Sequence, residues 1–355
     1  MSTRITRTCL ATVVGAALLL PPVAEAQSAP APRGWEVPRT AYGHPDLQGN
    51  WSNATITPIQ RPDGQEPTLT VAEVAEIEGT RVERIEEALQ ASDPDRAAPP
   101  VGGDGSTGAA GGVGGYNYFW IDAGDHVAVV NGEYRSSLIT NPPDGRVPPM
   151  IPAAIERRRA SFGGGARGGQ YDNPENRPAA ERCIVSFGSN AGPPMLPNYF
   201  YNNNYTIVQT RDHVMILTEM VHDVRVVRLG ERTRPLPTDV RPYFGDSWGR
   251  WEGDTLVVET TNISVAQSFQ GAPATADAKV VERFTRAGPN TLNYEFTVID
   301  PTTFMAEWGG TVPYNRQPGQ VYEYACHEGN YAMQNVLSGA RAEEARAAAD
   351  NNQSR

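Results

Sequence analysis

Short runs of β-branched and aromatic residues recur from residue 116 onward, and Gly, Pro, Asn and Asp separate them. This pattern is typical of strands joined by tight turns. The runs span residues 118–121, 126–130, 135–140, 205–210, 214–220, 224–229, 255–260, 280–285 and 291–299. No helices alternate with them, so the pattern predicts an all-β fold, either an antiparallel barrel or a packed sandwich. A β-propeller is the alternative, but the chain has no repeat with a period of about 40–50 residues.

Residues 70–91 carry the clearest helical pattern in the first half of the chain. Thr70 and Glu73 match a capping box, in which the hydroxyl and the carboxylate each bind a backbone N–H. Five apolar residues form one stripe opposite a charged face: Val74, Ile77, Val82, Ile85 and Leu89. We therefore expect one amphipathic helix that covers a sheet or the mouth of a barrel.

The N-terminus predicts export. Arg4 and Arg7 precede an apolar run over residues 10–20, and residues 24–26 (AEA) then provide an A-x-A cleavage site. A membrane-spanning helix needs about 20 apolar residues, and this run is too short for that. We expect a signal peptide over residues 1–26, no membrane span in the mature chain, and a periplasmic or secreted protein.

The remaining chain predicts a single β-rich domain over residues 44–340. Residues 27–43 are rich in Pro and small residues and predict an extended lead-in. The Gly-rich segments 99–115 and 161–170 lack the apolar side chains that a core needs, so we expect flexible surface loops there. Residues 341–355 are rich in Ala and charge without an apolar stripe, which indicates a disordered or frayed helical tail.

The charge of the chain argues against nucleic acid as a partner. The formal charge is −11, and it becomes −12 once Arg4, Arg7 and Glu25 leave with the signal peptide. An acidic surface repels phosphate backbones, and no basic stripe with interleaved aromatic residues is present in the sequence.

Cysteine usage predicts one disulfide. Cys9 belongs to the signal peptide, which leaves Cys183 and Cys326 in an oxidising compartment. In the chain-entropy model, a bond across this long loop stabilises the fold by roughly 4–5 kcal/mol. The alternatives are two buried thiols or a metal site, but neither cysteine has a CxxC partner.

Several sequence blocks carry a family resemblance. They are DLQGNW, PPDGRVPP, FGSNAGPPMLP, YNNNYTIVQ, EMVHDVRVVRL, GDSWGRWEGDTLVVETTNI and YEYACHEGNY. Together they resemble a large group of secreted bacterial proteins over most of residues 44–340. The resemblance implies export and one continuous domain, and it transfers no activity. Within the first block, Gly49 and Trp51 are also similar to the Gly-x-Trp of lipocalin-like barrels, whose Trp packs across the barrel floor, although an ordinary core Trp is the alternative.

Two histidine segments could carry acid–base chemistry. His222 and Asp223 lie in a run that otherwise predicts strand, and an unbroken pleat would place His222 on an apolar face. An imidazole there is either a hydrogen-bonded core residue or part of a cavity. His327 and Glu328 directly follow Cys326, so a disulfide would hold them rigidly beside Arg182. The alternative for that segment is a polar surface turn that caps a helix near residue 330.

Clusters of aromatic and amide side chains suggest a ligand site. Flat rings with a few aimed polar groups suit sugars and oxygenated aromatic compounds. The candidate ligand-binding residues are Trp120, Tyr201, Asn203, Asp246 and Trp248. No HExxH, HxH or G-x-S-x-G motif and no phosphate-binding Gly-rich loop is present, so the sequence predicts no metal and no cofactor.

Two functions follow from these residues. The first is an extracytoplasmic barrel that binds a polar or aromatic small molecule such as a sugar. The second is a lyase, isomerase or hydrolase that uses His222 or His327 as acid or base inside the barrel cavity, with Asp223, Glu328 and Arg182 as orienting groups. A purely structural role is a third alternative, and the sequence leaves the oligomeric state open.

Overall fold

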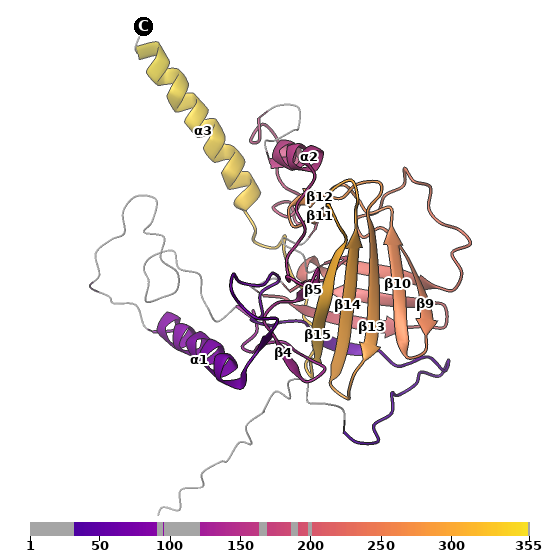
Figure 1. Cartoon of the computed structure of the whole chain (residues 1–355). Helices are drawn as coiled ribbons and strands as arrows, with labels where there is room; N and C mark the ends of the chain where they lie inside the picture. Colours follow the sequence, from indigo (N-terminus) through magenta and orange to yellow (C-terminus); the bar gives the residue numbers. More distant parts are fainter. Residues whose placement is uncertain are drawn as a thin grey trace, which may run out of the picture.

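The computed structural model describes residues 32–90, 95, 121–162, 169–185, 191–197 and 201–353. Its centre is a closed β-barrel (Figure 1). The expected signal peptide, the Gly-rich segment 99–115, residues 163–168 of the second Gly-rich segment and Trp120 lie outside the described residues. Among the described helices, none has the length and apolar character that a membrane crossing requires.

Nine of the described strands form the closed ring, in which β1 pairs with both β6 and β15. They are β1 (Gly49–Ser52), β6 (Asn204–Gln209), β7 (His213–Thr218), β8 (Val224–Leu229), β9 (Asp246–Glu252), β10 (Thr255–Thr261), β13 (Lys279–Arg286), β14 (Thr291–Ile299) and β15 (Trp308–Arg316). A tenth strand, β5 (Ile139–Asn141), extends the sheet by pairing with β15. The predicted all-β barrel is confirmed.

One neighbouring pair departs from the antiparallel prediction. Strands β8 and β9 run parallel, with Val227 opposite Ser247. Strand directions cannot alternate all the way round a closed ring with an odd number of strands, so at least one pair must be parallel. The connection between these two strands, residues 230–245, therefore crosses from one end of the strands to the other instead of forming a hairpin.

The remaining elements lie around the barrel. Strands β2 (Thr68–Leu69), β3 (Val129–Val130) and β4 (Glu133–Arg135) form a small sheet, and β11 (Ser268–Phe269) pairs with β12 (Ala272–Pro273). The helices are α1 (Val71–Ala88), α2 (Pro152–Phe162) and α3 (Ala332–Gln353), with short 3-10 turns at Pro174–Asn176 and Met220–His222. Figure 1 shows α2 with β11 and β12 at one end of the barrel, and α1 beside β4.

Helix α1 forms where the sequence predicts it. Thr70 and Glu73 make the expected capping box, and Val74 is buried. The Glu78 carboxylate accepts the Val127 N–H at 3.0 Å, which ties the helix to the segment before β3. The rest of the apolar stripe is more exposed, and the Val82 side chain is 50% accessible. The helix therefore covers the fold through its first turns.

Helix α2 was not assigned from the sequence, and helix α3 is longer and more regular than the frayed helix that the tail suggested. Helix α2 contains the basic residues Arg157, Arg158 and Arg159 and packs near β12. Its Arg157 donates to the Thr302 carbonyl at 2.6 Å. Helix α3 includes most of the tail that we expected to be frayed or disordered, and it projects away from the barrel (Figure 1).

The described interior of the barrel is a packed core with a buried ion pair. Arg225 in β8 donates two hydrogen bonds to the Glu282 carboxylate in β13, at 2.5 and 2.8 Å. Their side chains are 3% and 0% exposed. The Tyr294 hydroxyl donates a further bond to Glu282 at 2.8 Å. Hydrogen bonds of this kind are what allow charges to remain inside a protein.

A buried loop segment completes this core. All residues of the segment 191–197 are buried, and Met195 has no exposed surface. The Met195 N–H donates to the Tyr294 hydroxyl at 2.9 Å, and the Tyr314 hydroxyl donates to the Met195 carbonyl at 3.2 Å. The backbone of this segment thus satisfies two interior tyrosines. Side chains and this segment occupy the space where a barrel could otherwise take a ligand.

Trp51 belongs to the buried core of the barrel. The residue is completely buried, and its indole N–H donates to the Leu47 carbonyl at 2.9 Å. The guanidinium groups of Arg286 and Arg316 each stand 5.7 Å from its ring centroid. These cation–ring contacts and the hydrogen bonds of Arg286 to the Asp46 and Pro289 carbonyls hold the buried indole against its neighbouring segments.

Candidate functional site

A cleft of about 530 Å³ lies at the barrel rim, where β6 begins and β7 ends. Polar residues at the start of β6 and directly after β7 form one wall, and the disulfide-bonded segment around Cys326 forms the other. The lining residues are Asp122, Tyr201, Asn202, Asn204, Glu219, Tyr324, Ala325, Cys326, Glu328, Gly329 and Asn330. This size is in the range of small-molecule sites.

Asn204 and Glu219 form the centre of the barrel-side wall. The antiparallel register of β6 and β7, in which Tyr205 faces Thr218, brings these two residues together. The Glu219 N–H donates to the Asn204 carbonyl at 3.0 Å, and the Asn204 side-chain amide donates to the Glu219 carboxylate at 2.9 Å. Glu219 is 7% exposed, although it lines the cleft. The Asn204 Oδ1 atom is buried and has no hydrogen-bond partner among the described residues.

The predicted strand through His222 is wrong. Strand β7 ends at Thr218, and Met220–His222 forms a 3-10 turn before β8. Val221 and His222 have φ angles of 62° and 45°, a left-handed conformation that is uncommon without Gly. Two such residues reverse the chain within a short hairpin connection. His222 is therefore exposed at the rim and shares no apolar face with its neighbours.

His222 nevertheless reaches the opposite wall of the cleft. Its Nδ1 atom lies 3.3 Å from the carbonyl oxygen of Tyr324. Asp223, the next residue, is half-buried, and its Oδ2 atom has no hydrogen-bond partner among the described residues. Burial raises the pKa of the Asp223 carboxyl to about 6, and the neighbouring His222 opposes this rise.

The predicted disulfide between Cys183 and Cys326 is confirmed, and it anchors the second wall of the cleft. The Asn330 side-chain amide donates to the Cys326 carbonyl at 3.0 Å, which closes residues 326–330 into a compact turn. Glu328 in this turn lines the cleft. His327 is exposed beside it.

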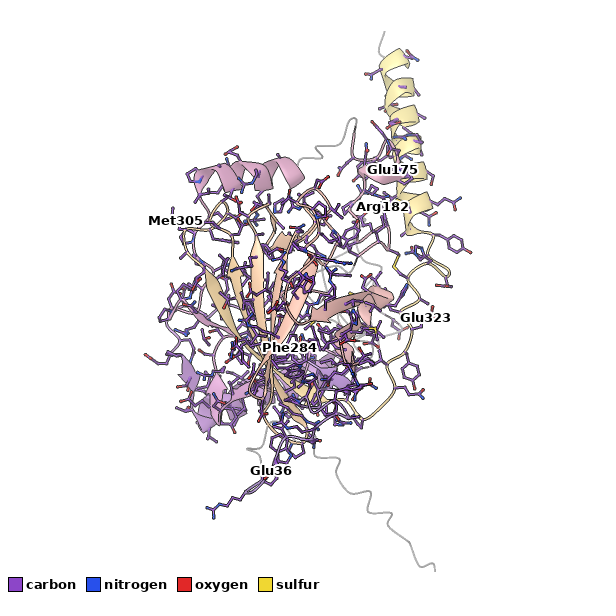
Figure 2. The ribbon with its side chains drawn as sticks, turned by 90° about the vertical axis from the view of Figure 1, so that its right-hand side faces the viewer. Glu36, Glu175, Arg182, Phe284, Met305 and Glu323 are labelled. Carbon is purple, nitrogen blue, oxygen red and sulfur yellow. A yellow bond between two sulfur atoms is a disulfide. The ribbon has the colours of Figure 1, made fainter. Side chains whose placement is uncertain are left out.

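Arg182 neighbours the disulfide as expected but does not line the cleft. It is half-buried, and its backbone N–H donates to the Pro178 carbonyl at 3.3 Å. Figure 2 shows Arg182 and Glu175 near the base of α3, and the hydrogen bond from Arg341 in α3 to the Asp172 carbonyl, at 3.4 Å, agrees with this placement.

The five predicted ligand-binding residues separate in space. Tyr201 lines the cleft. Asn203 is fully buried, and its side-chain amide donates to the Asp122 carbonyl at 2.8 Å. It therefore positions Asp122, which lines the cleft, without lining the cleft itself. Trp120 lies outside the described residues.

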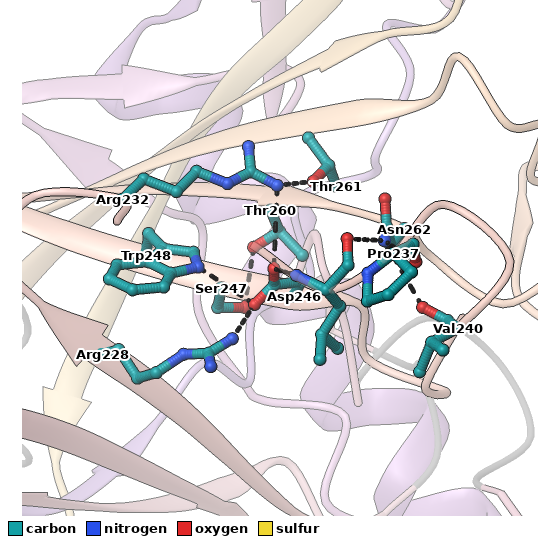
Figure 3. Close-up of polar contacts among 11 residues, drawn as sticks. Arg228, Arg232, Pro237, Val240, Asp246, Ser247, Trp248, Thr260, Thr261 and Asn262 are labelled. Atoms are coloured by element: carbon teal, nitrogen blue, oxygen red, sulfur yellow. Dashed lines mark hydrogen bonds and ion pairs between the residues drawn. The ribbon is translucent and has the colours of Figure 1, made fainter. Parts of the chain in front are cut away.

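Asp246 and Trp248 belong to a different network, at the start of β9 (Figure 3). Asp246 is 1% exposed and accepts hydrogen bonds from Arg228, from the Leu236 N–H at 2.9 Å and from the Trp248 indole at 3.1 Å. The Arg228 guanidinium also stacks on the Trp248 ring at 4.5 Å. These contacts fasten the crossing segment 230–245 to the parallel strand pair, which indicates a structural role.

A second, more apolar hollow adjoins the cleft. This groove has a volume of about 480 Å³ and lies between residues 177–181 and the first turns of α3. Its lining residues are Arg177, Ala180, Glu181, Tyr324, Cys326, Asn330, Ala332, Met333 and Val336. Tyr324, Cys326 and Asn330 also line the cleft, so these two hollows share a wall.

The cleft carries negative charge only. Its described lining contains three carboxylates, from Asp122, Glu219 and Glu328, and contains no Lys, Arg or His. Within the described part of the chain, no group of three or more His, Cys, Asp and Glu side chains is placed to hold a metal ion. The arrangement offers hydrogen-bond acceptors, amides and aromatic rings.

Comparisons of the chain with protein-family models, with curated proteins and with solved structures found no match. The function is therefore argued from the geometry alone. Sequence reasoning did not assign Asn204 and Glu219 to the site, because their approach depends on strand register. The only local signal was the polar run 202–204 beside a predicted strand.

Proposed function

We propose that this protein is an extracytoplasmic barrel that binds a small hydroxylated molecule, such as a sugar, in the rim cleft. The observation that carries the proposal is the Asn204–Glu219 pair. A carboxylate that is 7% exposed and an amide oxygen with no described partner both belong to the wall of a cleft large enough for a ligand. The signal-peptide pattern and the disulfide support the extracytoplasmic location.

The chemistry of the wall suits hydroxyl groups. Each sugar hydroxyl donates one hydrogen bond and accepts others, so it can donate to the Glu219 carboxylate. A hydrogen bond from a hydroxyl to a carboxylate is stronger than one to a neutral acceptor. Tyr201 and Tyr324 contribute aromatic rings to the same lining, and such rings pack against the apolar face of a sugar. The segment 324–330 opposes this wall and is fixed by the disulfide.

The charge of the lining determines which ligands are excluded. Three carboxylates without a lining cation disfavour carboxylate and phosphate ligands and accept neutral or cationic ones. A neutral sugar should therefore bind better than the matching sugar acid.

Calorimetric titration tests this proposal with methyl glycosides of glucose, galactose, mannose and N-acetylglucosamine, and with methyl glucuronide. Glu219→Gln keeps the shape but removes the charge, so affinity should fall about tenfold to a hundredfold, the range expected for a hydrogen bond to a charged group. Glu323→Gln is the matched control, because Glu323 is an exposed carboxylate directly before the opposite wall segment and does not line the cleft.

The proposal requires that at least one neutral glycoside binds and that methyl glucuronide binds at least tenfold more weakly than methyl glucoside. Binding that Glu219→Gln and Glu323→Gln weaken equally, or a preference for the glucuronide, would contradict it. Failure of every neutral glycoside would remove the sugar assignment.

Acid–base catalysis at the same rim is a second candidate, favoured by the Asp223 carboxyl with its pKa near 6 beside His222. Groups with shifted pKa values often mark catalytic sites. In this alternative, His327 and Glu328 from the opposite wall orient the substrate. These residues lie at the rim, so the earlier placement inside a barrel cavity does not hold. Hydrolysis of nitrophenyl glycosides with an inflection near pH 6 that Asp223→Asn removes would favour this function over binding alone.

A further inference from the structure

The rim cleft and the adjacent groove lie on either side of a shared wall. They share Tyr324, Cys326 and Asn330, and each has a volume suited to part of a small molecule, about 530 and 480 Å³. The segment that contains Cys326 therefore lies between the groove and any ligand group bound in the cleft.

The groove differs from the cleft in its chemistry. Ala180, Met333 and Val336 supply apolar surface, and the disulfide and the Tyr324 ring extend it. The charged residues at the groove, Arg177 and Glu181, pair at 2.7 Å and offset each other. The groove is thus apolar and close to neutral, whereas the cleft is polar and acidic.

The first turns of α3 leave apolar side chains uncovered beside this groove. Val336 is 36% exposed, and Tyr331 just before the helix is 68% exposed. A patch of exposed apolar residues next to a polar cleft is typical of a ligand or partner site. The three lining residues that the groove shares with the cleft favour a ligand that occupies both.

We propose that the natural ligand is amphipathic, with a hydroxylated head in the cleft and an alkyl or aryl tail in the groove. This inference rests on the proposed function, because it extends the same site. Glu219 and Asn204 hold the head, and Met333, Val336 and Ala180 cover the tail. The segment bearing Cys326 separates head from tail, and the disulfide holds it in place between them.

Matched glycoside pairs test the inference. Each methyl glycoside is titrated beside its n-octyl counterpart, and every octyl glycoside is kept below its micelle-forming concentration. The octyl member should bind at least tenfold more tightly. Met333→Gln and Val336→Asp should remove most of this advantage and leave the affinity for the methyl glycoside unchanged, because neither residue lines the cleft. Met305→Gln is the control, since Met305 is 65% exposed and distant from α3 (Figure 2).

The outcomes separate the two proposals. If methyl and octyl glycosides bind equally, the amphipathic assignment is wrong and the sugar-binding proposal stands. An octyl advantage that survives in both groove variants places the tail elsewhere and also overturns the inference. If no glycoside binds, both proposals fail. A change in oligomeric state on Val336→Asp, measured by light scattering without a change in affinity, would assign the groove to a second copy of the chain and overturn the inference.

Discussion

Removal of the Glu282 charge should destabilise the barrel strongly. Glu282 has no exposed surface, and it holds Arg225 through hydrogen bonds of 2.5 and 2.8 Å. Glu282→Gln leaves the Arg225 guanidinium buried without an opposite charge, and its Nε already lacks a partner among the described residues. Breaking a buried pair in this way costs about 3–5 kcal/mol. The single oxygen of the new amide can still accept the Tyr294 hydroxyl, so we expect a loss of about 3 kcal/mol.

Guanidinium denaturation followed by tryptophan fluorescence measures this loss. The double variant Arg225→Met with Glu282→Leu removes both charges, and replacing a buried pair by apolar residues is often close to neutral. It should therefore recover most of the stability lost in Glu282→Gln. Glu295→Gln on the same wall is the control: its side chain is 52% exposed and 3.8 Å from Arg283, so the change should stay below about 0.5 kcal/mol. A loss below about 1 kcal/mol in Glu282→Gln, or a double variant less stable than the single one, would refute the reasoning.

Two further predictions concern the rim. Burial raises the folded pKa of Asp223 to about 6, so the folded state binds this proton more tightly than the unfolded chain does. The free energy of unfolding should therefore fall as pH rises from about 4 to 6, and above pH 6 this group should change it no further. The full pKa shift corresponds to roughly 3 kcal/mol, which we reduce to about 1–1.5 kcal/mol because the side chain is half-exposed. In urea melts, Asp223→Asn should therefore be more stable than the parent at pH 7 and equal to it at pH 3.5. The same stability difference between variant and parent at both pH values would contradict the assignment. The double variant Cys183→Ser with Cys326→Ser should bind glycosides at least tenfold more weakly, because the disulfide fixes the cleft wall, while far-UV circular dichroism still shows the barrel. Unchanged affinity would show that the disulfide is not needed to position this wall.

Local sequence patterns predicted the parts of the fold that depend on local chemistry. The capping box of Thr70 and Glu73 and the hairpin formed by β13 and β14 follow from nearby residues. The disulfide followed from counting the cysteines outside the expected signal peptide. Each of these features could be predicted without knowing which distant residues are in contact in the folded chain.

Strand β15 shows why other parts were missed. It contains Gly309, Gly310 and Pro313, which weaken any strand prediction. In the barrel, a Cβ on Gly310 would stand 1.9 Å from the Leu138 carbonyl oxygen. The glycine is present because β5 approaches there, and that contact is invisible in the local sequence.

The candidate site was only partly predictable for the same reason. Local alternation predicted a continuous strand through His222, but Val221 and His222 adopt left-handed angles, which are rare for a β-branched residue such as Val221. Glu219 and Asn204 come together only through the register of β6 and β7. Asp246 and Trp248 looked like ligand residues because charge and aromatic rings coincide, whereas their described partners belong to the crossing segment and its strands.

The central claim is that the ligand binds in the rim cleft and outside the packed barrel interior. The most direct measurement is a crystal structure of the protein with the tightest-binding octyl glycoside. We predict the sugar within hydrogen-bond distance of the Glu219 carboxylate and beside Asn204, with residues 191–197 still buried in the barrel. A sugar beside Glu282 in the interior, with Met195 displaced, would contradict the account.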